Sequence, residues 1–121
     1  MAIQAVIVPV TGFQQNCTVI WCSETKKGAV IDPGGDLDRI LDAAKQNGAT
    51  IEKVLITHGH IDHAGSAAEL AEQLDVPIEG PQRDDSFWID MLQEQGEKYG
   101  VPDARSFQPT RWLEHGDSIS F

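Results

Sequence analysis

The sequence predicts an α+β domain in which helices flank a mixed β-sheet. Short β-branched runs occupy the first 31 residues, apolar stripes of helical spacing alternate with further strands, and three histidines cluster directly behind one strand. β-Branched runs favour strands, and apolar residues spaced i, i+3, i+4 and i+7 favour a helix with one buried face. These patterns together indicate a sheet with helices packed on it and a polar loop at one end.

Three strands are predicted near the N-terminus, over residues 5–10, 17–22 and 29–31. Gly12 with residues 14–16 forms the first turn, and residues 26–28 form the second. Because both turns are short, we expect the strands to pair as an antiparallel meander.

The segment Asp32-Pro33-Gly34-Gly35 then breaks the strand pattern. Asp36 is predicted to cap a helix, and Gly48 suits the position just after its end. The buried face of this helix is expected to hold Leu37, Ile40, Leu41 and Ala44.

Alternating strands and helices continue the pattern. Residues 51–57 are predicted to form a strand in which Val54, Leu55 and Ile56 are buried. Residues 64–74 are predicted to form a helix and residues 76–78 a short strand. The inward face of that helix is expected to hold Ala67, Leu70, Ala71 and Leu74.

The last third of the chain is less regular. Asp84 or Asp85 is expected to cap a helix that runs to about residue 95 and turns three side chains inward, those of Phe87, Met91 and Leu92. Residues 96–110 are predicted to be a loop, 114–117 a turn, and 118–121 the opening of a strand. That strand has no room for a return strand after it, so its partner must come from earlier in the chain, from another molecule or from sequence beyond these 121 residues. We expect the last of these, a longer protein. The three tryptophans, Trp21, Trp88 and Trp112, are expected to pack in or around the core rather than bind substrate.

Composition excludes several classes of function. The chain has 9 Lys and Arg against 19 Asp and Glu, a net charge of −10, so nucleic acid and anionic membranes are poor partners. No apolar run approaches membrane-spanning length, and the N-terminus lacks the basic start and cleavage site of a signal peptide. We therefore expect a cytoplasmic protein.

Its two cysteines, Cys17 and Cys22, would point to opposite faces of one strand and are expected to be reduced thiols.

The strongest functional signal is the segment from Thr57 to His63, which contains His58, His60, Asp62 and His63. Imidazole nitrogen and carboxylate oxygen are both zinc ligands, and a loop after a strand can turn His58 and His60 toward one point and Asp62 and His63 toward a neighbouring one. A helix that starts after His63 would also disfavour imidazolium there, which leaves the neutral imidazoles that metals need. The alternative is a polar loop whose histidines lie in solvent. Asp32 has two interpretations of equal weight, a support for a metal-binding histidine or a turn residue before Pro33.

The segment from Leu55 to Gly65 resembles the signature loop of the metallo-β-lactamase superfamily, and Asp32-Pro33-Gly34-Gly35 resembles the turn after that family's early strands. Residues 13–17 and 111–113 resemble the glyoxalase II-like branch, in particular its small single-domain bacterial members. The resemblance implies an αββα sandwich with a two-metal site, and it identifies residues 1–121 as the N-terminal half of one such domain, with no second domain.

The resemblance also implies a ligand set and a reaction. His58 and His60 would bind one metal, and Asp62 and His63 the other, with zinc as the expected metal and iron or manganese as alternatives. The implied reaction is hydrolysis of a small thioester of the hydroxyacylglutathione type, in which Asp62 also orients the attacking water. The family's later ligands, a histidine in a Gly-His turn, a bridging aspartate and a final histidine, do not occur here, and His115 is expected to be a surface residue.

Two other functions are compatible with the sequence. One is an iron-dependent oxidoreductase similar to persulfide dioxygenases, which carry a similar loop. The other is an inactive half-domain that only binds metal, because two protein ligands per metal are fewer than the three usual at catalytic zinc.

Overall fold

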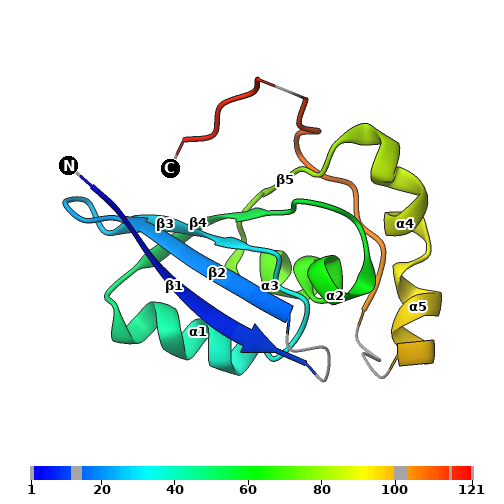
Figure 1. Ribbon diagram of the computed structural model, residues 1–121, viewed down its shortest axis with the longest axis horizontal. Helices are drawn as coiled ribbons and strands as arrows, with labels where there is room; N and C mark the ends of the chain where they lie inside the picture. The colour runs from blue at the N-terminus through cyan, green and yellow to red at the C-terminus, as the bar shows by residue number, and fades with distance from the viewer. Residues whose placement is uncertain (1, 12–14, 100–103, 115, 121) are drawn as a thin grey trace.

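The computed structural model describes residues 2–11, 15–99, 104–114 and 116–120. Its centre is a five-stranded sheet with the strand order β1-β2-β3-β4-β5 (Figure 1). The strands are β1 (Ile3–Val10), β2 (Gln15–Cys22), β3 (Lys27–Ile31), β4 (Thr50–Leu55) and β5 (Ile78–Glu79). The first three pair antiparallel and the last two join in parallel, so the sheet is mixed, as predicted.

The first hairpin is longer than the sequence suggested. Gln15 and Asn16, which we expected in the turn, belong to β2 and pair with Val10 and Pro9. The register continues to the pair Ile3–Cys22, so both strands have eight residues. The turn residues 12–14 lie outside the described residues.

One face of the sheet holds the core. Val19, Val30, Val54 and Ile78 follow one another across four strands, and helices α1 (Leu37–Gln46) and α3 (Ala67–Leu74) cover them. The predicted helical stripes are confirmed, since α1 buries Ile40 and Ala44 with Leu37 and Leu41 half-buried, and α3 buries Ala67, Leu70 and Ala71. Each helix therefore contributes the apolar face that its sequence spacing predicted.

The opposite face of the sheet is partly uncovered. Side chains alternate along β1, so that Val8 and Val10 are buried whereas Ile3 and Ile7 remain 64% and 59% exposed. An αββα sandwich covers this face with its second sheet. The exposure of Ile3 and Ile7 is therefore the pattern expected of one sheet of such a fold.

The predicted helix over residues 64–74 is in fact two helices. The short α2 (Ile61–Ala64) begins three residues earlier than expected, and α3 begins at Ala67 after a break at Gly65 and Ser66. The break arises because the turn at residues 33–35 packs against this segment, and the Ser66 amide donates to the Pro33 carbonyl (2.9 Å). Asp62 and His63 thus lie in a helical turn rather than in the loop before a helix.

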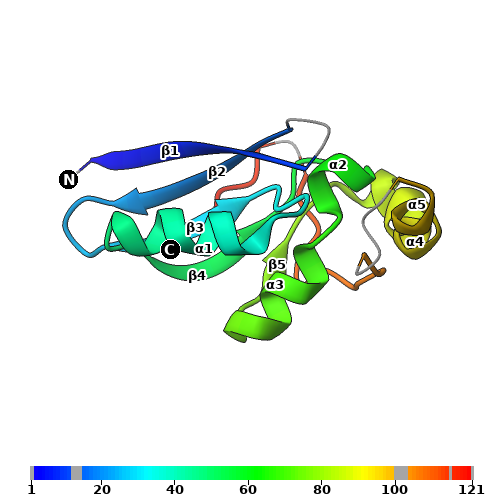
Figure 2. The same ribbon diagram turned by 90° about the horizontal axis from the view of Figure 1, so that it is seen from below.

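The second predicted helix is also divided. A 3-10 turn, η1 (Arg83–Asp85), precedes α4 (Ser86–Asp90) and α5 (Leu92–Tyr99), with Met91 between them. Gln82, not an aspartate, caps the start, because its Oε1 accepts from the Asp84 amide at 2.8 Å. Leu92 is buried, as predicted, and Ile89 is buried with it, whereas Phe87 is 61% exposed and Met91 only half-buried, contrary to prediction. Figures 1 and 2 show α4 and α5 beyond the end of the sheet at which α2 lies.

Three smaller predictions can be compared with the structure. Asp36 precedes α1 but makes no side-chain cap, because its Oδ2 accepts from the Thr11 amide (2.7 Å) instead. The turn at 114–117 is confirmed by a bond from the Asp117 amide to the Glu114 carbonyl (3.0 Å), whereas His115 lies outside the described residues. Residues 118–120 form no strand, since no strand among the described residues lies beside them; Phe121 is not among those residues.

Both cysteines are buried free thiols, as expected. No helix in the described ranges is long and apolar enough to cross a membrane.

Candidate metal site

The histidine segment lies where β4 ends. β4 stops at Leu55, and the chain then passes through His58 and His60 into α2, which carries Asp62 and His63. The carbonyl of His60 accepts the amides of His63 (3.0 Å) and Ala64 (2.8 Å), which closes the first turn of α2. The sequence prediction that these four side chains share one place in the fold is consistent with this arrangement.

The three imidazoles lie against one another. The ring centroids of His58 and His63 are 3.8 Å apart, and those of His58 and His60 are 4.7 Å apart. Rings this close would repel if they were protonated. Burial, followed by the neighbouring His63 and His60, lowers the pKa of His58. Burial and crowding therefore favour the neutral form of His58, the form that binds metal, and the helix expected to start after His63 in fact begins at Ile61.

Asp32 fixes the orientation of His63. The Asp32 side chain is buried, and its Oδ2 lies 2.9 Å from Nδ1 of His63. The same carboxylate accepts the Thr57 amide (2.8 Å) and the Thr57 hydroxyl (2.5 Å). The sequence left two interpretations of Asp32 open, and both apply. Asp32 is a turn residue with a positive φ of 58°, and it contacts the candidate ligand His63. Aspartate is one of the few non-glycine residues that adopt this conformation readily.

This contact determines which nitrogen of His63 is free. A carboxylate only accepts hydrogen bonds, so the Asp32 contact places a proton on Nδ1 and leaves Nε2 as the nitrogen that would bind a metal. Nε2 in turn lies 3.4 Å from Oδ2 of Asp62. Two ligands about 2.0–2.1 Å from one tetrahedral zinc are separated by about 3.4 Å, so His63 and Asp62 have the spacing of a ligand pair.

Gln15 is a neighbour of this site that the sequence analysis did not identify. Its buried side chain places Nε2 3.3 Å from Nδ1 of His63 and 2.7 Å from the Asn16 carbonyl. Its Oε1 is buried without a hydrogen-bond partner among the described residues. Only the β1–β2 hairpin register brings Gln15 here, and the pattern of single residues contained no signal for it.

His58 contributes an unpartnered atom. Its Nδ1 is buried and has no hydrogen-bond partner among the described residues. A buried polar atom without a partner is costly unless a water or a ligand pairs with it. The donor set fits a divalent metal in this respect, and the carboxylates of Asp32 and Asp62 add the negative charge that a cation site needs.

The assignment of two protein ligands to each metal stays a prediction. The His58 ring lies closer to His63 (3.8 Å) than to His60 (4.7 Å), and in the described part of the chain no group of three or more His, Cys, Asp or Glu side chains converges as a single metal site.

Three glycines allow the segment to pack this tightly. A methyl group at Gly34 would overlap with the Asp62 carbonyl oxygen, and one at Gly65 would lie 2.6 Å from the carbonyl oxygens of Gly34 and Ile61. At Gly59 it would lie 3.0 Å from the Asp85 carbonyl and 3.1 Å from Ile89 and Trp88. The turn at 33–35 and helix α4 thus hold the histidine segment from two sides.

The tryptophans occupy different environments. Trp21 is buried and Trp112 packs half-buried against the core, as expected. Trp88 is 37% exposed, and its ring meets that of His60 edge-on at 4.5 Å. Trp88 thus packs at the rim, as expected, and it also lies next to the candidate metal site.

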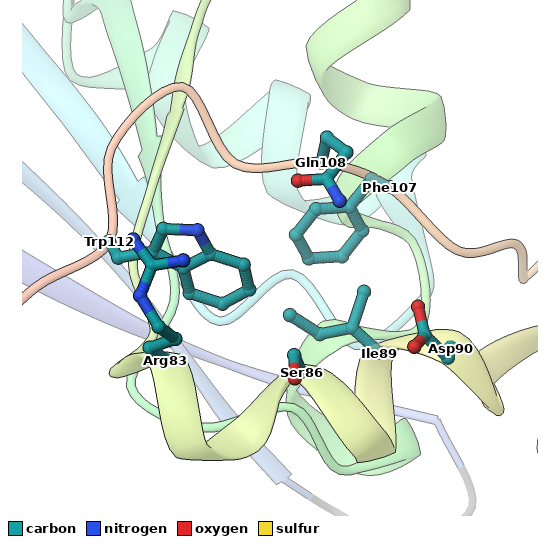
Figure 3. A pocket seen from close by; sticks show the side chains of 7 residues that line it. All are labelled: Arg83, Ser86, Ile89, Asp90, Phe107, Gln108 and Trp112. Carbon is teal, nitrogen blue, oxygen red and sulfur yellow. The ribbon is translucent and has the colours of Figure 1, made fainter.

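A separate pocket of about 340 Å³ lies between α4 and the segment 107–112 (Figure 3). Ser86, Ile89 and Asp90 form its α4 wall, and Arg83 lies over the Trp112 ring at 5.3 Å. Ile89 also contacts the position of Gly59, so this buried side chain separates the pocket from the histidine segment. The pocket is consequently not part of the candidate metal site.

Comparisons with known proteins agree with the fold and the motif. The family model described as the metallo-beta-lactamase superfamily matches residues 10–121. Hydroxyacylglutathione hydrolase GloC of Haemophilus influenzae is 40% identical over 113 residues, which are 93% of this chain and 53% of that protein. The crystal structure of TTHA1623 in a di-iron-bound form matches with a TM-score of 0.81 and 26% identity, over 94% of this chain and 56% of that chain. The structure of the BLEG-1 B3 metallo-beta-lactamase gives a TM-score of 0.78 at 22% identity, over 97% of this chain and 56% of that chain.

The chain belongs to the metallo-beta-lactamase superfamily. It spans about half the length of these relatives, and its five-stranded sheet and helices correspond to the N-terminal half of their fold.

Proposed function

We propose that this chain provides the N-terminal half of a metal-dependent hydrolase that cleaves thioesters of the hydroxyacylglutathione type. The observation that carries the proposal is the pair formed by Nε2 of His63 and Oδ2 of Asp62, 3.4 Å apart, with His63 oriented by Asp32. The 40% identity to a protein named hydroxyacylglutathione hydrolase supports this substrate class.

His58 and His60 would hold one metal ion, and Asp62 and His63 would hold a second. Two such ions polarise a carbonyl oxygen and lower the pKa of a bound water, so that it becomes a nucleophile at neutral pH. Zinc is the proposed metal, since nitrogen and oxygen donors of this kind suit it.

The side chains of this chain would have three tasks. His58, crowded by the rings of His60 and His63, has a lowered pKa and so keeps a lone pair available for a metal. Asp32 holds the Nδ1 proton of His63, which fixes the ring orientation. Asp62, with one oxygen directed at His63 and a partly exposed carboxylate, accepts a hydrogen bond from the attacking water and orients it toward the thioester carbon.

The leaving group needs little help from the protein. A thiol has a pKa near 8.5, so the thiolate departs without a general acid. This agrees with a site whose histidines are ligands rather than proton donors.

The test uses the zinc-loaded protein expressed from its complete coding sequence. We expect it to hydrolyse lactoylglutathione, and Asp62→Asn to reduce kcat/KM at least about 100-fold. Asp38→Asn is the matched control, since Asp38 is exposed in the first turn of α1, and it should keep full activity. Oxygen uptake with glutathione persulfide and no thioester turnover would replace the proposal with an iron oxidoreductase. Zinc binding with neither activity would support an inactive metal-binding protein.

A further inference from the structure

Two aromatic side chains stand exposed beside the candidate metal site. Phe87 is 61% exposed and Trp88 is 37% exposed, although both belong to the short helix α4, whose buried residue is Ile89. Ile89 and the following Leu92 anchor this part of the chain in the core. The packing of α4 therefore does not explain why two large apolar rings face solvent at this point.

The two rings continue the row that begins at His60. The rings of His60 and Trp88 meet edge-on with centroids 4.5 Å apart, and those of Trp88 and Phe87 meet edge-on at 5.3 Å. The row thus leads directly from a proposed metal ligand outward along α4, and a molecule bound at the metals would lie next to it.

The fold holds this row in place. The Gly59 amide donates to Oδ2 of Asp85 at 2.8 Å, which ties the start of α4 to the histidine segment. A side chain at position 59 would be too close to Trp88, since a Cβ atom there would lie 3.1 Å from Cβ of Trp88. The rings are therefore fixed relative to His60, as a binding surface must be.

The chemistry of the row indicates what it binds. Both rings are uncharged and apolar, and the chain as a whole has a net charge of −10. Such a surface favours an uncharged apolar group over an anionic one.

On this basis, and resting on the function proposed above, we propose that Phe87 and Trp88 form an apolar subsite for the acyl group of the thioester substrate. The enzyme would then prefer thioesters whose acyl group carries an alkyl or aryl chain over those with a short polar acyl group.

Binding of uncleavable thioethers tests this subsite without catalysis. S-butyl-, S-hexyl- and S-octylglutathione place an alkyl chain where the acyl chain would lie, and their Kd values can be measured by calorimetry on the zinc-loaded protein from the complete coding sequence. A methylene that is fully buried strengthens binding about fourfold, so a chain lying on one wall should gain about twofold per methylene.

Variants separate the subsite from general packing. Phe87→Ala and Trp88→Leu should each reduce the gain per methylene to nearly nothing, while Leu at position 88 keeps an apolar side chain against Gly59. Tyr99→Ala is the matched control, since Tyr99 is an exposed aromatic residue at the far end of α5, and it should keep the wild-type dependence. Thermal melting of each variant checks that the fold is retained.

Two results would overturn the subsite: Kd values that do not depend on chain length in the wild type, or the same dependence in Phe87→Ala and Trp88→Leu. These results differ from a failure of the proposed function. If the protein hydrolyses lactoylglutathione but the Kd values of the S-alkylglutathiones do not depend on chain length, only the subsite is refuted. If the Kd values fall with chain length but no thioester is hydrolysed, the hydrolase function is refuted and the apolar binding site is supported.

Discussion

Nδ1 of His63 lies 2.9 Å from Oδ2 of Asp32, a residue 31 positions earlier in the chain. The same carboxylate binds the amide and the hydroxyl of Thr57, so one buried aspartate joins the turn after β3, the end of β4 and helix α2. The ring orientation of a candidate metal ligand is thereby determined by a residue outside the histidine motif.

Replacement of this aspartate should weaken metal binding. In Asp32→Asn, the side-chain amide can donate an N–H toward Nδ1 of His63, where the carboxylate accepted the Nδ1 proton. The His63 ring could then carry its proton on Nε2, the nitrogen that would bind the metal. We expect zinc affinity to fall about 10- to 100-fold, measured by competition with a chelator. Asp36→Asn is the matched control, because Asp36 also has a positive φ (51°) and its carboxylate also accepts a backbone amide, from Thr11. Equal zinc affinity in the Asp32 variant and the wild type would show that this contact does not support the site.

Removal of the Gln15 side-chain amide should leave stability almost unchanged. Its Oε1 has no hydrogen-bond partner among the described residues, so Gln15→Leu removes one buried polar atom without a hydrogen bond. The substitution loses one bond to the Asn16 carbonyl and the long 3.3 Å contact with Nδ1 of His63. We expect the free energy of unfolding in urea to change by less than about 1.5 kcal/mol. A loss well above 2 kcal/mol would mean that Oε1 has a partner in solution.

A methyl group at Gly34 should damage the fold and the site together. The added Cβ would overlap with the carbonyl of Asp62, and only a backbone shift can relieve this contact. Gly34→Ala should cost about 1–3 kcal/mol and weaken zinc binding. Gly48→Ala is the control: its site is open and its φ is 69°, so it should cost about 1–2 kcal/mol through the left-handed conformation alone and leave zinc binding intact.

Stability should decline in alkali because of Cys17. Burial, and secondarily the charge of Asp32, raise the pKa of this thiol from 9.0 to about 12. Above pH 9 the unfolded chain loses this proton while the folded protein keeps it, so the stability contribution is complete below pH 9 and is lost as pH rises toward 12. The stability difference between wild type and Cys17→Ala should therefore shrink by about 1.4 kcal/mol per pH unit above 9. A difference that stays constant from pH 8 to 10.5 would contradict the raised pKa of Cys17.

The elements that the sequence predicted well are those with their own periodic signal. The strands of the meander, the stripes of α1 and α3, and the buried run Val54–Leu55–Ile56 follow from side-chain spacing alone. The four candidate ligands were likewise identifiable, because they lie within six residues of one another.

The errors occurred where distant segments decide the local structure. The break at Gly65 and Ser66 arises from contact with Pro33, and the contact of Asp36 with Thr11 replaces a helix cap. Phe87 was expected to face inward together with Met91 and Leu92, whereas the buried face of this segment is formed by Ile89 and Leu92, three residues apart. Gln15 reaches His63 only through the pairing of β1 with β2, which no single-residue pattern reveals.

Anomalous diffraction at the zinc edge, on crystals of the protein from its complete coding sequence, tests the central claim most directly. We expect two peaks about 3.5–4 Å apart, one within ligand distance of His58 and His60 and the other within ligand distance of Asp62 and His63. The absence of a peak at these four side chains, with zinc bound elsewhere, would contradict it.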